Sequence, residues 1–140
     1  YGILSKIMTL DLSALEKAIS QLVEGLDLAS KPTAHPLLRD GAIQRFEFTY
    51  EVSWKMLKRF LEATSGDPQS IDTLAFSDLI RLGHERGILR SSYDVWALFR
   101  KARGTTSHTY DQNKAAEVFQ VIPQFLGEAQ FLLAQLRARS

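Results

Sequence analysis

The sequence predicts an all-α protein, and two observations support this fold class. Apolar residues recur at steps of three and four along most of the chain, which is the spacing that lines one face of a helix. No segment alternates apolar and polar residues as a half-buried strand does. We therefore expect an up-and-down antiparallel bundle of four long helices plus one short helix.

The first two predicted helices cover about residues 10–28 and 38–63. Lys31-Pro32 and His35-Pro36 should end the first helix, because proline lacks the amide donor and disfavours the helical conformation in the residue before it. The second helix is apolar beyond a single stripe, which favours burial on two sides, and we expect a homodimer. Its stripe consists of Ile43, Phe46, Tyr50, Trp54, Leu57 and Leu61, and Phe48, Val52 and Met56 lie off it.

The next two predicted helices are a short one and a longer one. Asp67-Pro68 should begin the short helix, since a capping acceptor followed by proline is the favoured start. Apolar residues then continue from Ile71 to Ile80. Ser91 or Ser92 can cap the following helix, and Gly104 should break the chain direction at its end.

The last predicted helix extends to the carboxy-terminal arginines. Thr109 followed by Gln112 matches a capping box, in which two side chains satisfy free backbone donors at a helix start. From Ala115 to Leu136 the apolar residues repeat almost as heptads.

Length and composition describe one ordinary globular domain. The 140 residues are 45% apolar and 24% charged. We assign residues 8–140 to a single helical domain and 1–7 to an N-terminal extension, because Met8 follows that extension. No apolar run approaches the roughly 20 residues of a membrane span, so we expect a cytoplasmic protein without membrane contact. The absence of cysteine excludes disulfides and thiolate chemistry.

Positive charge gathers in the second half of the chain. Residues 79–114 hold seven Lys or Arg and three Asp or Glu, a balance of 7 − 3 = +4, whereas the whole chain has +1. This stretch suits phosphates of a nucleotide or RNA, although such runs are more often a solvated helix surface.

Several catalytic motifs are absent from the sequence. There is no Gly-rich phosphate loop, no His-Glu-x-x-His and no pair of aspartates two residues apart, so the chain is not itself a nucleotidyltransferase. His35, His84 and His108 lack metal-ligand spacing. We expect no metal and no cofactor.

The candidate functional residues lie between Arg103 and Tyr110. These eight residues contain an arginine, four aliphatic hydroxyls, His108 and a phenol. Arginine binds phosphate through parallel hydrogen bonds and histidine transfers protons near neutral pH, which together suit transesterification of a phosphodiester. On spacing alone the alternative is preferred, in which Arg103 neutralises a helix end and His108 and Tyr110 pack.

The segment Arg-x4-His-x-Tyr resembles the signature of HEPN domains of the HepT type. Residues 41–55 and 107–111 also resemble the second helix and the fourth-to-fifth helix junction of nucleotidyltransferase substrate-binding proteins. The resemblance covers nearly everything after Leu10 and implies a helical homodimer that works with a minimal nucleotidyltransferase on a separate chain. Many such pairs are read as toxin and antitoxin.

The resemblance also implies roles for individual residues. Arg103 and His108 would match the ribonuclease pair, shared between two subunits, and Tyr110 would match the tyrosine that the partner enzyme adenylylates. We add four neighbours as candidate phosphate-binding residues, namely Arg100, Lys101, Thr105 and Ser107. HEPN ribonucleases usually carry a polar residue directly after the motif arginine, and here that residue is Gly104. A metal-independent endoribonuclease, a noncatalytic substrate-binding or regulatory subunit, and a purely structural helical dimer therefore all remain open.

Two further groups rank second as site residues. Glu47, Glu51 and Lys55 stand four residues apart on the second helix, where a surface ion-pair ladder is the safer interpretation. Trp54 and Trp96 can stack on a base, but aromatics at helical spacing more often pack in the core, and we assign both to packing.

Overall fold

The computed structural model of the protein describes residues 10–139, and the predicted extension of residues 1–7 lies outside them. The described residues form helices and no strand, which confirms the all-α prediction. None of these helices is both long and apolar enough to cross a membrane. The elements are α2 (Ser13–Ala29), α3 (Pro36–Thr64), α4 (Pro68–Asp72), α5 (Phe76–Glu85), α6 (Tyr93–Thr105), a 3-10 turn η1 (Thr106–His108) and α7 (Gln112–Ala138).

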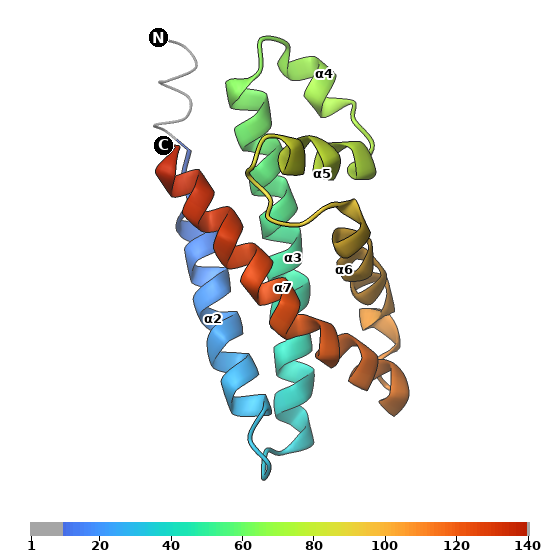
Figure 1. The fold of residues 1–140 in the computed structure, drawn as a ribbon. Coiled ribbons are helices and arrows are strands. Elements are labelled where there is room, and N and C mark those ends of the chain that lie inside the picture. Colours follow the sequence, from blue (N-terminus) through green and yellow to red (C-terminus); the bar gives the residue numbers. More distant parts are fainter. Residues whose placement is uncertain (1–9, 140) are drawn as a thin grey trace.

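The long helix α3 is the centre of the fold. Figure 1 shows α2 running antiparallel beside it, α7 crossing it, and α6 on the side away from α2. Helices α4 and α5 lie near the carboxy-terminal end of α3. The 3-10 turn packs against α3, α6 and α7, so the predicted site joins three long helices.

An aromatic cluster fills the core between α3, α6 and α7. The ring of Phe125 meets those of Phe46, Trp96 and Phe99 edge-on at centroid distances of 5.1, 6.1 and 5.3 Å. Edge-to-face contacts of this kind add to the stabilisation that burial provides. Trp96 is fully buried, which confirms its assignment to packing, whereas Trp54 is only half-buried.

Pro36 begins a helix, where the sequence analysis used it only to end one. His35 is the N-cap residue of α3, and its Nδ1 accepts a hydrogen bond of 3.1 Å from the amide of Leu37. Proline at the first helical position has no amide to leave unpaired, and its fixed φ suits a helix. The second helix therefore starts two residues before the predicted Leu38.

The segment predicted as one short helix forms two. Helix α4 ends at Asp72 and α5 begins at Phe76. Pro68 takes the first helical position as expected, but the Asp67 side chain makes no capping bond. The Oγ of Ser65 instead accepts a hydrogen bond of 3.0 Å from the amide of Asp67.

The helix boundaries around the motif also differ from the predictions. Helix α6 continues through Gly104 to Thr105, because glycine only weakens a helix and the chain turns at the following 3-10 turn. Asp111 caps α7, accepting from the amides of Asn113 and Lys114 at 2.9 and 3.3 Å. The predicted cap, Thr109, donates to the carbonyl of Thr106 instead.

A buried carboxylate fixes the loop between α5 and α6 to α7. Glu128 is 1% exposed, and its Oε1 lies 3.4 Å from Nε of Arg90. The hydroxyl of Ser91 donates to the same oxygen. Gly127 leaves room for this arrangement, since a Cβ there would stand 3.0 Å from Nη2 of Arg90.

Removing Arg90 should destabilise the protein mainly because the buried carboxylate of Glu128 loses its ion-pair partner. We expect Arg90→Ala to lower the free energy of unfolding by about 2 kcal/mol, less than for a fully buried pair because half of Arg90 is exposed to solvent. The double variant Arg90→Ala/Glu128→Met should recover most of this loss. Urea denaturation of both variants measures the difference, and a double variant as unstable as the single one would contradict the argument.

Candidate functional site

The guanidinium of Arg103 lies between two carboxylates of α3. Its Nη1 is 3.0 Å from Oε2 of Glu47, and its Nε is 3.3 Å from Oε1 of Glu51. The two glutamates are one helical turn apart and therefore face the same way from α3. The three side chains are each about one third exposed, at 35%, 36% and 33%. The motif arginine of α6 is thus held by a pair of acids from the central helix.

Thr106 completes this cluster. Its hydroxyl lies 2.7 Å from Oε2 of Glu47 and 2.7 Å from the carbonyl of Arg103, and it accepts a bond of 3.2 Å from Nη1 of Arg103. The hydroxyl thereby links the first residue of the 3-10 turn to both α3 and α6. Thr106 is one of the four hydroxyl residues between Arg103 and Tyr110, but it is not among the predicted site residues.

The guanidinium keeps donors that protein groups do not use. Nε of Arg103 is within ion-pair distance of Glu51, but its hydrogen does not point at the oxygen, and this buried atom makes no hydrogen bond. Within residues 10–139, Nη2 makes no hydrogen bond. A phosphate oxygen arriving from solvent would find this second terminal nitrogen available.

His108 and Tyr110 lie on the surface. Tyr110 is 82% exposed, His108 is also exposed, and their rings meet edge-on with centroids 6.1 Å apart. Nδ1 of His35 caps α3, and Nδ1 of His84 lies 3.2 Å from the carbonyl of Leu89. Within residues 10–139, no hydrogen bond occupies either ring nitrogen of His108. The structure therefore favours a solvent-facing role for His108 over packing.

The structure separates the four predicted phosphate-binding neighbours. Arg100 lines the same cavity as Arg103, since the two are three residues apart on α6. Lys101 and Thr105 line a different, smaller cavity between α6 and α7. Ser107 is exposed in the 3-10 turn. Only Arg100 is thus brought together with the motif arginine in one cavity.

The ion pair predicted along α3 is present, and its carboxylate also contacts side chains beyond that pair. Nζ of Lys55 lies 3.9 Å from Oε2 of Glu51, as the spacing of four residues predicts. Glu51 also accepts a hydrogen bond of 3.2 Å from the indole of Trp54 and faces Arg103. The spacing predicted the pair of Glu51 with Lys55, whereas Arg103, the other cation that Glu51 meets, comes from a helix that is distant in the sequence.

Tyr50 is a cavity residue that sequence analysis assigned only to the apolar stripe. It lines a cavity with Arg100 and Arg103, although it is only 3% exposed. Burial raises the pKa of its phenol far above 10.0, and nearby Arg100 opposes this shift. The phenol is therefore uncharged at neutral pH.

Fold and motif together define a class, that of a helical protein with a partly buried, ion-paired Arg and an exposed His and Tyr around one helix junction. Residues 10–138 match the family described as "Nucleotidyltransferase substrate binding protein like". The chain belongs to this family, which confirms the resemblance found in the sequence.

Individual relatives support this membership. "Probable ribonuclease HepT" of Haemophilus influenzae is 38% identical over 128 residues, covering 91% of this chain and 87% of the relative. A solved Haemophilus influenzae structure, described as the fold of a substrate binding domain of a nucleotidyltransferase, has a TM-score of 0.84 and 37% identity, covering 91% of this chain and 99% of that one. A crystal structure from Thermus thermophilus has a TM-score of 0.71 and 32% identity, covering 88% of this chain and 98% of that one.

Loss of the Thr106 hydroxyl should destabilise the protein. We expect Thr106→Val to lower the free energy of unfolding by about 1–2 kcal/mol, because half-buried Glu47 and Arg103 each lose a partner. Thr105→Val is the matched control, since the Thr105 hydroxyl donates only to a carbonyl of its own helix. Urea denaturation compares the two, and equal losses would show that the contacts to Glu47 and Arg103 add no stability.

Stability at alkaline pH should depend on Tyr50. Below pH 10 its phenol is protonated in both the folded and the unfolded chain, so it adds no pH dependence. Above pH 10 only the unfolded chain releases this proton, and the free energy of unfolding falls. We expect Tyr50→Phe to lose less stability than the wild type over that range. Denaturation curves at neutral pH and above pH 10 test this, and parallel losses would contradict it.

Proposed function

We propose that this protein is the HEPN-type partner subunit of a separate minimal nucleotidyltransferase, and that it binds and cleaves RNA at Arg103 and His108 without a metal. One observation carries the proposal. His108 is an exposed histidine whose ring nitrogens make no hydrogen bond in the described structure, and five residues earlier two carboxylates fix the guanidinium of Arg103, whose Nη2 makes no hydrogen bond there. Proton transfer and charge stabilisation are what phosphodiester cleavage requires.

The proposed reaction is an internal transesterification. The 2′-hydroxyl oxygen of the RNA attacks the neighbouring phosphorus, and the bond from phosphorus to the 5′-oxygen breaks. His108 takes the proton from the hydroxyl, and the leaving oxygen receives a proton from the His108 of a second subunit. The products are a 2′,3′-cyclic phosphate and a free 5′-hydroxyl. Arg103 stabilises the extra negative charge on the phosphorus oxygens, which are the atoms that gain it.

This scheme requires a homodimer. Phe48 of α3 is 56% exposed, which is unusual for a large apolar side chain of a central helix. Val52, one turn further along α3, is only half-buried. Burial of this α3 face against a second copy would explain why the helix is apolar beyond a single stripe.

Tyr110 is the proposed modification site. Its 82% exposure makes its hydroxyl accessible to a partner enzyme. In adenylylation the phenol oxygen attacks the α-phosphorus of ATP, pyrophosphate leaves, and the phenol proton is lost. The added phosphate would stand next to His108, whose ring touches the Tyr110 ring edge-on. A negative charge at that position would repel RNA and silence the site.

A noncatalytic substrate-binding subunit is the second candidate, and two observations favour it. Glu47 and Glu51 both form ion pairs with Arg103 and so take up the positive charge that would stabilise a reacting phosphate. Gly104 supplies no polar side chain after the motif arginine, and a Cβ there would meet nothing within 4 Å. Phosphate binding without cleavage would fit both.

Incubation of the purified protein with RNA and a chelator separates the two candidates. We expect cleavage that yields cyclic phosphate ends and that falls about a hundredfold or more in His108→Ala. His35→Asn is the matched control, because asparagine also caps a helix and that histidine serves only as a cap. RNA that the wild type binds but leaves intact would establish the noncatalytic subunit, and cleavage that survives His108→Ala would refute the assigned role.

A further inference from the structure

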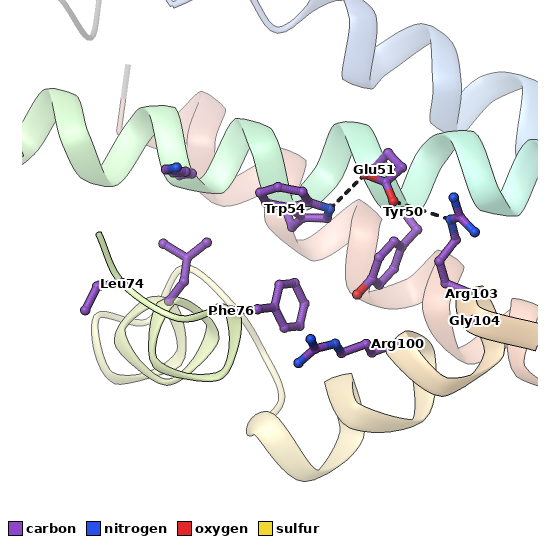
Figure 2. Close-up of a pocket in the computed structure, with 10 residues that line it drawn as sticks. Tyr50, Glu51, Trp54, Leu74, Phe76, Arg100, Arg103 and Gly104 are labelled. Atoms are coloured by element: carbon purple, nitrogen blue, oxygen red, sulfur yellow. Dashed lines mark hydrogen bonds and ion pairs between the residues drawn. The ribbon is translucent and has the colours of Figure 1, made fainter. Parts of the chain in front are cut away.

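A cavity adjoins the Arg103–Tyr110 motif, and the proposed reaction assigns no role to it. A cavity of about 500 Å³ lies between α3, the α4–α5 segment and α6, and this volume is within the range of small-molecule sites. Figure 2 shows side chains of these segments turned toward it. The residues that matter here are Tyr50, Trp54, Phe76, Arg100, Arg103 and Glu51.

Three aromatic rings form its apolar wall. The Trp54 and Phe76 rings meet edge-on at 6.1 Å and 85°, and the Tyr50 and Phe76 rings lie 6.2 Å apart at 35°. Trp54 and Phe76 are only half-buried, so ring surface remains open to a ligand. Rings at these angles leave faces on which a planar group can stack.

Arg100 brings a positive charge that the protein does not neutralise. Its guanidinium carbon lies 5.0 Å from the centroid of the Phe76 ring, and no carboxylate within residues 10–139 pairs with it. The other cations of the cavity are paired, Lys58 with Asp72 at 2.9 Å and Arg103 with two glutamates. Arg100 is exposed and is therefore the cation available to an anion from solvent.

The cavity is continuous with the motif. Arg103 and Gly104 belong to its lining, and the absence of a side chain at Gly104 leaves this edge open. A ligand with one planar aromatic end and one phosphate end satisfies both halves of the lining. A simple anion would leave the rings unused, and a purely apolar ligand would leave Arg100 unpaired.

We infer that this cavity binds one nucleotide, with its base against Trp54 and Phe76 and its phosphate on Arg100. The inference deepens the proposed function, because the bound nucleotide would lie beside the Arg103 at which RNA is proposed to be cut. It predicts that a base next to the scissile phosphate, or a free nucleotide, enters between α3 and α5.

The two tryptophans provide a direct test by nuclear magnetic resonance. The indole N–H of Trp54 bonds to Glu51 in the cavity, whereas that of Trp96 is buried without a partner, so each gives a distinct signal that Trp54→Phe assigns. AMP should shift the Trp54 signal and leave the Trp96 signal in place. Ribose 5-phosphate should shift neither. If neither AMP nor a short oligoribonucleotide shifts the Trp54 signal, or if ribose 5-phosphate shifts it as much as AMP does, base binding in this cavity is refuted.

Matched substitutions test the two halves of the cavity. Arg100→Gln should weaken AMP binding about tenfold, since a charge-assisted phosphate contact is lost. Arg81→Gln is its control, because Arg81 also stacks on a ring, that of Tyr93 at 4.8 Å, but lies outside the cavity. Phe76→Leu should weaken binding similarly, whereas Phe119→Leu, at a half-buried phenylalanine of α7 outside the cavity, should not. Equal effects of test and control substitutions would contradict the inference.

Two probes distinguish binding of an RNA base from binding of a free nucleotide, and they test the cavity separately from the proposed function. His108→Ala protein titrated with a short oligoribonucleotide shows whether an RNA base reaches Trp54, while AMP reports on free nucleotide. A shift with either probe supports the cavity assignment. AMP binding in a protein that neither binds nor cleaves RNA would remove the proposed function and leave the cavity assignment standing. RNA cleavage by the wild type, together with a Trp54 signal that neither probe shifts, would support the proposed function and refute the cavity assignment.

Discussion

The ion-pair cluster of Arg103 with Glu47 and Glu51 connects the parts of the protein on which the site depends. Each pair is about one third exposed and would contribute little alone. The Thr106 hydroxyl joins them into one network, so that α3, α6 and the 3-10 turn are fixed to one another at a single point. Because the 3-10 turn starts at Thr106, fixing Thr106 also positions His108 two residues later.

The same cluster sets the electrostatic character of the site. The charge of Arg103 is taken up by Glu47 and Glu51, and Lys55 lies 3.9 Å from Glu51, so the cluster leaves no net positive charge to attract a phosphate. A phosphate therefore needs a further cation nearby, and Arg100 in the adjoining cavity supplies one without an acidic partner in the described structure. The two glutamates orient Arg103, and Arg100 supplies the attraction for a phosphate.

Periodicity predicted the long helices, because the core stripe of a helix such as α3 is a local pattern, but it missed the break between α4 and α5 and could not predict pairing between helices. The role of Pro36 was missed because proline both ends and begins helices, and only the bond from His35 distinguishes the two cases. Glu47 and Glu51 were interpreted as part of a surface ion-pair ladder with Lys55, because their contact with Arg103 spans more than fifty residues of sequence. Thr106 could have been found from its position three residues after Arg103 on a helical path.

The backbone of the motif is secured at both ends. It leaves α6 through the carbonyl of Arg103, to which the amide of Thr106 bonds, and it enters α7 at Asp111, whose carboxylate holds two amides. Folding has therefore already met the conformational entropy cost of ordering this connection. A ligand that docks here has the exposed side chains of Ser107, His108 and Tyr110 left to immobilise but not the backbone, and such preorganisation lets modest contacts yield useful affinity.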